Sequence, residues 1–341
     1  MVANRPNGQG KPSLAEVAKM TGVSISTVSK VANGGANVSD ATRERVEHAL
    51  KERGYVTPRK RRGSTTPVTV LARDMYSPYT LDVLRGAIDA AETSQLDVTV
   101  AVYPDDARDL RWIDELHAAG RRGVIAITST LDDAERARFA AHRIPLVVID
   151  PLSNPEEDTY SIGATNWAGG VSATEHLTEL GHRRIAILSG YPEAMASRAR
   201  LSGFLAGLAA AGVEPDPELE LPGDFTFDSG LELGEKVLAR DPRPTAVVTA
   251  SDSQALGVLE AARRAGLRVP ADLSVIGFDD LIMAQMSSPP LTTVRQPLDL
   301  MGAAAVETLA ALLAGSTPRS HHTELATRLV VRSSTGPVAM G

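Results

Sequence analysis

The chain has no cysteine, few aromatic residues and no long uninterrupted run of apolar residues. The absence of cysteine from all 341 residues excludes disulfides, thiolate metal ligands and a cysteine nucleophile. No stretch reaches the roughly 18 apolar residues of a membrane-spanning helix. The opening MVANRPNGQGKPS has neither an apolar core nor a cleavage signature, so it does not predict a signal peptide. We therefore expect a cytoplasmic protein without a membrane partner.

Several enzyme motifs are missing as well. The sequence has no Walker loop, no Gly-x-Ser-x-Gly elbow, no His-Glu-x-x-His helix and no Gly-x-Gly-x-x-Gly turn after its first predicted strand. No group of candidate ligands indicates a metal site, and no cofactor is predicted. Asp279 and Asp280 could act as an acid–base pair only if a turn brought them together, because adjacent side chains point apart. We predict that the chain is not an enzyme.

Charge is distributed unevenly along the chain. Residues 1–66 hold 12 Lys and Arg against 5 Asp and Glu, a net of +7. The totals of 35 basic and 42 acidic residues leave 23 and 37 for the remainder, a net of −14. A basic N-terminal segment on an acidic body indicates a polyanionic partner for that segment alone.

The basic segment contains the pattern of three short helices. Ser13 and Glu16 form a capping box for the first, Ser24 can cap a second over 25–32, and a third follows Ser39 and ends at Gly54. A turn at Gly22 between the first two is typical of a helix-turn-helix, although a small helical cap with no DNA contact fits the same pattern. The basic, Pro-bounded stretch 59–66 then predicts a linker.

Beyond residue 67 the pattern changes to short apolar runs that alternate with helical stretches, which predicts open parallel sheets of βα units. The expected strands are 68–72, 98–103, 123–128, 146–150, 185–189, 246–250 and 274–278. The expected helices are 80–94, 110–119, 134–142, 167–180, 197–211, 229–238 and 253–265. Periodicity alone does not decide between one large sheet and two smaller ones.

The run LAEVAKMTGVSISTVSKVANGGANVSDATRERVEHALKERGY resembles the headpiece of the lactose-repressor (LacI/GalR) family. The resemblance implies that the second helix lies in the DNA major groove, where Ile25, Ser26 and Lys30 read bases. Other polar residues match positions that hold the DNA backbone or cap helices: Ser24, Thr27, Ser29, Asn33, Asn37, Ser39 and Thr42.

The linker departs from the family pattern. Many members place a minor-groove leucine in a hinge helix, and Ser64 stands about where that leucine would be. Either the hinge bends DNA differently, or Arg59 and Arg61 follow a minor groove or phosphates without a wedge. Alternatively, 59–62 is a solvated linker with nonspecific attraction only.

The resemblance continues through ATNWAGGVSATEHLTELGHRRIAILSG, SRARLSGFLAGL, PGDFTFDSG, SDSQALGVLEAARRAGLRVPADLSVIGFDD and SPPLTTVRQP. It implies a two-lobed sensor similar to periplasmic binding proteins, with two Rossmann-like parallel sheets and a ligand between them. The implied domains are a headpiece at 11–58, a basic hinge at 59–66 and a sensor at 67–338. Lobe 1 is expected at about 67–166 and 297–326, and lobe 2 at about 167–296 and 327–338.

Candidate ligand-binding residues lie mostly where predicted strands end. Arg200 matches the family's ligand-clamping arginine, and its planar donor fork suits adjacent hydroxyls or a carboxylate. The full set comprises Tyr79, Asp150, Asn166, Arg200, Phe225, Ser251, Asp252 and Asp279. Each has a structural alternative: the strand-terminal Asp residues could cap helices, the aromatic residues could belong to the core, and the arginine could form a surface ion pair.

The resemblance implies a homodimeric repressor that binds double-stranded operator DNA and responds allosterically to a small-molecule effector, with a sugar favoured. Dimerisation would place two recognition helices in successive major grooves. The alternative is a sugar-metabolising enzyme that carries a DNA-binding head. The sequence does not identify the effector, the operator or the direction of the response.

Overall fold

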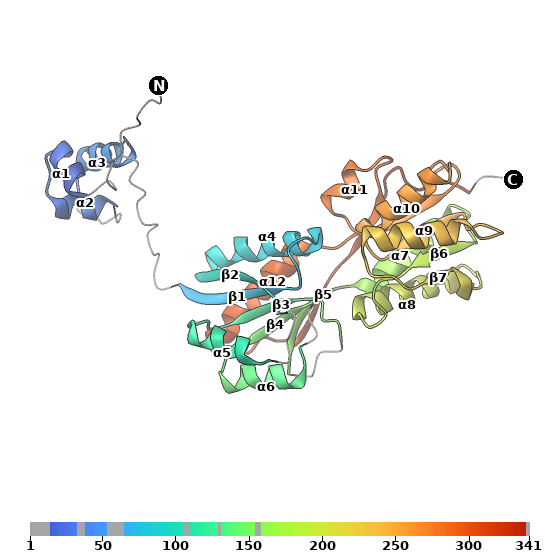
Figure 1. Ribbon diagram of the computed structural model, residues 1–341, viewed down its shortest axis with the longest axis horizontal. Helices are drawn as coiled ribbons and strands as arrows, with labels where there is room; N and C mark the ends of the chain where they lie inside the picture. Colours follow the sequence, from blue (N-terminus) through green and yellow to red (C-terminus); the bar gives the residue numbers. More distant parts are fainter. Residues whose placement is uncertain are drawn as a thin grey trace, which may run out of the picture. The chain divides into compact units, whose positions relative to one another are not determined.

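The computed structural model describes residues 14–32, 38–52, 65–104, 109–128, 131–153 and 158–338 (Figure 1). The chain forms two compact units, Met1–Thr65 and Thr66–Gly341. Seven residues that the sequence predictions name lie outside the described residues: Ser13, Asn33, Asn37, Gly54, Arg59, Arg61 and Ser64.

The N-terminal unit contains three helices in its described part: α1 (Leu14–Thr21), α2 (Ile25–Ala32) and α3 (Asp40–Glu52). Gly22 turns the chain between the first two helices with φ +68°, a conformation that glycine adopts without steric cost. Ser24 caps α2 by accepting a hydrogen bond from the Thr27 amide at 3.1 Å. The predicted helix-turn-helix is therefore confirmed, and its small core is formed by Val17, Ala18, Val28, Val31, Val46, Ala49 and Leu50.

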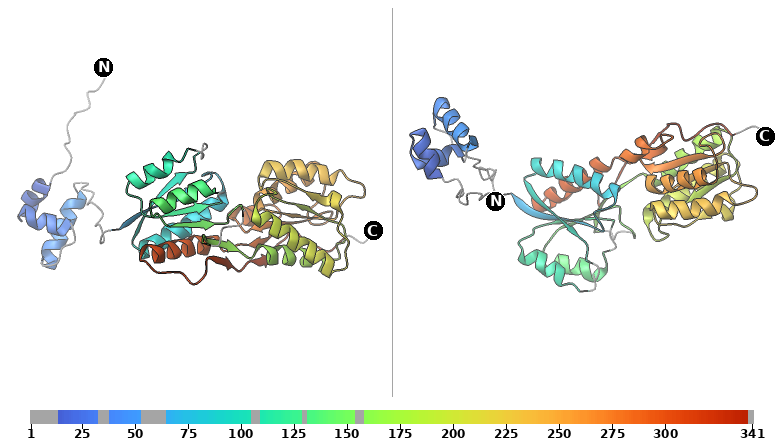
Figure 2. Two further views of the ribbon diagram at one scale, coloured as in Figure 1. Left: turned by 90° about the horizontal axis from the view of Figure 1, so that it is seen from below. Right: turned by 45° about the horizontal axis from the view of Figure 1, so that its top comes forward.

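Two lobes make up the larger unit, and each contains one sheet. In lobe 1 the strands run in the order β11 (His322–Leu325), β5 (Tyr160–Ala164), β4 (Leu146–Ile149), β3 (Val124–Ile127), β1 (Thr66–Ala72) and β2 (Leu96–Val102). All neighbouring strands are parallel. Helices α4 (Pro78–Thr93) and α12 (Leu298–Leu313) cover one face, and α5 (Arg111–Ala118) and α6 (Asp133–Ala141) cover the other (Figure 2).

Lobe 2 repeats this arrangement. Its strands run in the order β12 (Arg328–Val330), β10 (Thr292–Arg295), β9 (Ser274–Asp279), β8 (Ala246–Thr249), β6 (Ile185–Leu188) and β7 (Glu220–Leu221), with β12 alone antiparallel to its neighbour. Helices α7 (Asn166–Glu179) and α8 (Met195–Ala210) pack on one face, and α9 (Phe227–Leu238) and α10 (Asp252–Arg264) pack on the other (Figure 2). The short η1 (Pro217–Leu219) and α11 (Ile282–Met286) complete the lobe.

The chain crosses between the lobes three times: between β5 and α7, between β10 and α12, and between β11 and β12. Two crossings are hydrogen-bonded to each other through Thr165 and Thr327, whose side-chain oxygens lie 3.0 Å apart. The Thr165 amide also donates to the Leu325 carbonyl at 2.9 Å. These contacts hold two of the three crossings side by side.

Two glycines allow α4 and α12 to pack closely on lobe 1. A Cβ on Gly86 would lie 1.9 Å from the Asp299 carbonyl oxygen, and one on Gly302 would lie 2.1 Å from the Val83 carbonyl oxygen. No larger residue fits at either position without separating the helices. The first residues of α4 line a cavity between the lobes. The close packing of α4 on α12 therefore fixes the position of that part of the cavity wall.

The seven predicted strands correspond to β1, β2, β3, β4, β6, β8 and β9, and two sheets, not one, are present. Strands β5, β7, β10, β11 and β12 and helices α11 and α12 were not predicted. The missed strands are short or rich in Thr and charged residues, so they lack the continuous apolar run used to find the others. Within the described part of the chain, none of the helices combines the length and hydrophobicity required to cross a membrane.

Candidate ligand-binding cleft and DNA-binding helix

A cavity of about 450 Å³ lies between the two lobes, within the ~300–1,000 Å³ range of small-molecule sites. The loops that follow β1, β3, β4, β6, β7, β8 and β9 contribute to its walls, so it lies at the carboxyl ends of both sheets. Its polar and aromatic lining includes Arg73, Asp74, Tyr76, Tyr79, Thr128, Asp150, Tyr191, Arg200, Asp224, Phe225, Phe227, Ser251 and Asp279.

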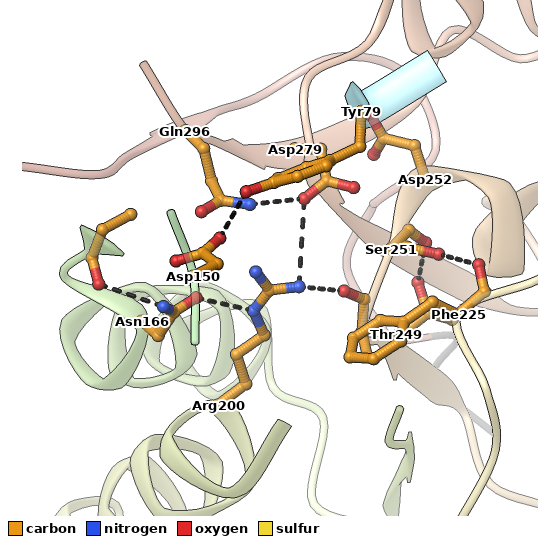
Figure 3. Close-up of polar contacts among 12 residues, drawn as sticks. Tyr79, Asp150, Asn166, Arg200, Phe225, Thr249, Ser251, Asp252, Asp279 and Gln296 are labelled. Carbon is orange, nitrogen blue, oxygen red and sulfur yellow. Dashed lines mark hydrogen bonds and ion pairs between the residues drawn. The ribbon is translucent and has the colours of Figure 1, made fainter. Parts of the chain in front are cut away.

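Lobe 1 contributes a hydrogen-bonded tyrosine–aspartate pair. Tyr79 lies in the first turn of α4, and its hydroxyl donates to Asp150 Oδ2 at 2.6 Å (Figure 3). Asp150 follows β4 with φ +44°, so a tight left-handed turn aims the carboxylate into the cavity. Burial raises the pKa of Asp150 above its ordinary value, while the bond from Tyr79 opposes that rise.

Lobe 2 contributes a buried guanidinium. Arg200 lies on α8, and its Nε donates to Asn166 Oδ1 at 2.8 Å. Its Nη1 donates to the Ala250 carbonyl and lies 3.8 Å from Asp279 Oδ1 (Figure 3). The guanidinium carbon lies 3.7 Å from the Phe278 ring centroid, close enough for a cation–π interaction. Burial lowers the pKa of Arg200, and the nearby carboxylates of Asp279 and Asp150 raise it.

Asp279 ends β9 and is held by the crossing segment between β10 and α12. It accepts a hydrogen bond from Gln296 Nε2 at 2.7 Å. Burial raises the pKa of Asp279 to about 7, although Arg200 and Gln296 both favour the charged form. Its protonation state therefore changes near neutral pH.

Asp252 lies behind this wall and is fully buried. Thr293 Oγ1 donates to its Oδ1 at 2.5 Å, and the Leu281 amide donates to its Oδ2 at 2.7 Å. Burial, with the charge of Asp279 adding to it, raises the pKa of Asp252 well above its ordinary value. Asp252 thus joins the start of α10 to β10 and to the loop that carries Asp279.

Phe225 is positioned by the loop before α9 and by the start of α10. Its backbone has φ +69°, and its carbonyl accepts a hydrogen bond from Ser251 Oγ at 2.6 Å. Ser251 also caps α10 by accepting from the Gln254 amide at 3.0 Å. A side chain at Gly190 would collide with the Phe225 ring, because a Cβ there would lie 2.0 Å from its Cζ. The glycine therefore leaves space for the ring.

The structure brings six of the eight candidate residues to the cavity wall: Tyr79, Asp150, Arg200, Phe225, Ser251 and Asp279. Asn166 and Asp252 do not line the cavity. Asn166 accepts a hydrogen bond from Arg200 and Asp252 accepts one from the Leu281 amide, and both of these partner residues line the cavity. The sequence analysis missed Tyr76, Tyr191, Asp224 and Phe227. A search of the residues shortly after each predicted strand would have found Tyr76 after β1 and Tyr191 after β6. Asp224 and Phe227 follow β7, which the sequence pattern did not predict.

The lobes contact each other beside the cavity. The Met195 amide at the start of α8 donates to the Leu152 carbonyl, which follows β4, at 3.1 Å. Leu281 of lobe 2 packs within the lobe 1 core, and Met283 contacts the same core. Both lobes therefore share apolar and hydrogen-bonding contacts around the cavity.

Helix α2 presents an exposed set of side chains suited to a DNA groove. Ile25, Ser26 and Lys30 are exposed, and Ile25 retains 54% of its accessible surface. Thr27 is half-buried, and its hydroxyl lies 2.8 Å from Ser24 Oγ. Ser39 donates to Thr42 Oγ1 at 2.9 Å at the start of α3. An exposed apolar residue with hydroxyls and one lysine on a helix face is compatible with contact to base edges and phosphates.

Two family profiles match the chain. The profile of bacterial regulatory proteins, lacI family, matches residues 13–58. The profile of the periplasmic binding protein-like domain matches residues 174–335.

Curated relatives span almost the whole chain. The HTH-type transcriptional regulator CelR of Thermobifida fusca is 35% identical over 334 residues, which cover 95% of this chain and 98% of CelR. The HTH-type transcriptional repressor CytR of Escherichia coli strain K12 is 31% identical and covers 94% and 96% of the two chains.

Solved structures of transcriptional regulators are also similar to this chain. A transcriptional regulator CelR–cellobiose complex superposes with a TM-score of 0.73 at 34% identity, covering 95% of this chain and 99% of the other. The lac repressor dimer bound to operator and the anti-inducer ONPF gives a TM-score of 0.73 at 29% identity, covering 96% and 100%. The α/β fold with a helix-turn-helix unit and a two-lobed sensor is thereby confirmed.

Proposed function

Since the chain belongs to the LacI family of bacterial regulatory proteins and is a DNA-binding transcriptional regulator, we propose that it represses its target genes until a sugar binds between its lobes. The observation that carries this proposal is the buried Arg200, which faces the cavity with Asp150 and Asp279 around it. One guanidinium donor and two carboxylate acceptors together suit a ring of vicinal hydroxyls.

The charge of the cavity favours a neutral ligand over an anion. Its lining contains four aspartates but only two arginines, Arg73 and Arg200. Asp74 and Asp224 alone offset the charges of Arg73 and Arg200, so a phosphate or carboxylate ligand would meet no net positive charge in the cavity. The relative CelR has been solved in complex with cellobiose, which supports a saccharide as the effector of this chain.

We assign DNA binding to the headpiece at 11–58, followed by the hinge at 59–66 and the sensor at 67–338. Base contacts come from Ile25, Ser26 and Lys30 of α2, which are exposed. A homodimer would present two such helices to an operator with two-fold symmetry, as in the lac repressor dimer bound to operator. Binding to chromosomal DNA requires a cytoplasmic location.

The effector can control DNA binding if its affinity differs between two arrangements of the lobes. An effector that contacts Asp150 and Tyr79 of lobe 1 and Arg200 of lobe 2 binds one lobe arrangement better than another. The same free-energy difference is then available to change the affinity for DNA. Neither catalytic turnover nor a cofactor is needed, and the relatives named above are regulators, not enzymes.

The test is a gel-shift of the full chain on DNA from upstream of its own gene, repeated with a panel of mono- and disaccharides. We expect a specific complex that one sugar dissociates. Specific DNA binding that no sugar changes would overturn the effector class. The absence of binding above that to random DNA, with sugar consumed, would instead favour the enzyme alternative.

A further inference from the structure

We propose that the cavity contains a second, aromatic subsite that holds another pyranose ring, so that the effector is a disaccharide or longer saccharide. This inference rests on the proposed function and specifies its ligand class. Three side chains define the aromatic subsite: Tyr76, Tyr191 and Phe227, all of which line the cavity.

These three aromatic side chains are unusually exposed. Tyr76 retains 94% of its accessible surface, Tyr191 36% and Phe227 41%. Most large apolar side chains of the described residues are buried in one of the cores, because exposure of apolar surface is unfavourable. Exposed apolar residues gathered around one cavity are typical of a ligand-binding surface.

Tyr76 is exposed on an ordered loop. Asp74 Oδ1 accepts hydrogen bonds from the Tyr76 amide at 2.8 Å and from the Ser77 amide at 2.7 Å. The next residue, Pro78, begins α4. The backbone that carries Tyr76 is therefore fixed between β1 and α4, which reduces the entropy lost when the ring meets a ligand.

The opposite wall comes from lobe 2. Tyr191 lies edge-on to Phe225, with ring centroids 5.7 Å apart and an interplanar angle of 65°. Phe227 is the first residue of α9, whose N-cap Thr226 accepts a hydrogen bond from the Ser229 amide at 3.1 Å. Asp224 accepts from the Thr226 amide at 2.9 Å and adds a carboxylate to this wall. Lobe 2 thus supplies a fixed aromatic wall with one acidic group.

A pyranose ring matches this combination, because its two faces present C–H groups and its edge presents hydroxyls. Aromatic rings cover the faces, and carboxylates such as Asp74 and Asp224 accept from the edge. A monosaccharide held by Arg200, Asp150 and Asp279 would leave the exposed aromatic rings uncovered. A second ring would contact Tyr76 of lobe 1 and the aromatic wall of lobe 2, and would thereby add to the free energy that draws the lobes together.

The experiment is isothermal titration calorimetry of the full chain with hexoses and pentoses and with the disaccharides built from them. One disaccharide is expected to bind on the order of tenfold or more tightly than either of its component sugars, the effect of one covered aromatic side chain. Equal affinity for a disaccharide and its component sugar would overturn the second subsite and leave the proposed function intact.

Single substitutions distinguish the aromatic subsite from the part of the cavity around Arg200. Tyr76→Ala is expected to lower affinity for the disaccharide by about tenfold and to leave affinity for the monosaccharide unchanged. Phe227→Ala should likewise lower affinity for the disaccharide and leave affinity for the monosaccharide unchanged. Trp167→Ala is the matched control, because Trp167 is an exposed aromatic residue, at 51%, that does not line the cavity.

The outcomes are distinguishable. Loss of affinity for both ligands to the same degree in Tyr76→Ala would overturn the subsite, since the residue would then act on the whole cavity. If wild-type protein binds none of the saccharides, the proposed effector class fails together with this inference. Monosaccharide binding that releases DNA, together with a disaccharide affinity that is no higher and that Tyr76→Ala does not change, would support the proposed function and overturn the aromatic subsite.

Discussion

Arg200 differs from the exposed arginines of the sensor, because its charge is balanced inside the protein. Arg263 and Arg264 pair with Glu260 on an exposed helix face, where solvent screens the interaction. Arg200 is 6% exposed and has Asp279, Asn166 and the Ala250 carbonyl around it. A buried charge of this kind requires its partners, so its removal affects both ligand contact and the position of neighbouring groups.

We predict that Arg200→Ala abolishes the effector response while operator binding persists. The loss of charge-assisted hydrogen bonds corresponds to about 1.5–3 kcal/mol, or roughly 10- to 150-fold in Kd. Effector titration of a preformed DNA complex measures the response, and urea unfolding reports on the fold. Arg198→Ala is the matched control, because Arg198 is exposed on the same helix. An unchanged effector titration in Arg200→Ala would remove this residue from the site.

The pKa of Asp279 predicts a pH dependence of stability. Burial raises it from the ordinary 3.8 to about 7, so between these values the native state keeps a proton that the unfolded chain has lost. The contribution to stability is complete below about pH 4 and is lost as pH rises through 7. We expect the free energy of unfolding to fall between about pH 4 and pH 7.

Asp279→Asn tests this assignment, because an amide cannot titrate. The variant should show a flatter pH dependence in denaturant unfolding across the same interval. An identical slope in both proteins would mean that other groups, such as Asp150 or Asp252, dominate the titration.

The residues of the cavity were predicted where a strand ended in an acid or where a motif carried the position. Asp150 and Asp279 follow apolar runs directly, so the sequence alone located them. Tyr76 lies four residues beyond β1, and its exposure depends on the turn that Asp74 forms. Such placement depends on loop geometry, which hydrophobic periodicity does not encode.

At the scale of single elements, α2 offers one cation within an otherwise neutral surface. Lys30 is exposed near the end of the helix, five residues after Ile25. A lysine that reaches a guanine edge contributes to discrimination between sequences, whereas one that contacts only phosphate contributes equally to all DNA.

Lys30→Ala is predicted to weaken operator binding by about 1–3 kcal/mol and to relax discrimination against random DNA. Competition by random DNA in a fluorescence anisotropy assay measures both quantities. Lys19→Ala removes the same charge from an exposed position on α1. This control should lower the two affinities equally or not at all. A Lys30 variant with unchanged discrimination would contradict the base-reading role.

Element prediction succeeded for the strands in the middle of each sheet and for the edge strand β2. It missed the edge strands β7, β11 and β12 and the adjoining strands β5 and β10. The central strands β3, β4, β6 and β8 have every or nearly every residue buried, so they appear as apolar runs. In β10, Thr292 and Thr293 are buried although their side chains are polar, so the sequence pattern did not indicate a buried strand. Their hydroxyls form hydrogen bonds with Thr335 and Asp252, which are distant in the sequence. Helix α12 was not predicted either, although Leu298, Met301, Ala305 and Leu309 recur at helical spacing.

For the whole molecule, the separation of charge predicts two different responses to salt. Residues 1–66 carry a net charge of +7 and the remainder −14. A protein with 6–10 phosphate contacts loses roughly 10³–10⁵ in DNA affinity between about 50 and 200 mM salt. Effector binding in an enclosed cavity should change far less over the same range, because buried interactions are screened weakly.

Operator and effector affinities measured in parallel at several salt concentrations check this expectation. The logarithm of operator affinity should fall linearly with the logarithm of salt concentration, while effector affinity stays nearly constant. A shallow slope for DNA would show that few phosphates are contacted and that the basic 59–62 stretch adds little.

The order of the strands has a consequence for how the protein is made. Each sensor sheet receives an edge strand, β11 or β12, from the last part of the chain, and Ser334 bonds the Thr292 amide and the Val275 carbonyl beyond them. On the ribosome, the headpiece emerges with all its described helices before residue 66, whereas neither lobe can complete its sheet until the final strands are released. A nascent chain therefore acquires its helix-turn-helix well before either lobe of its sensor is complete.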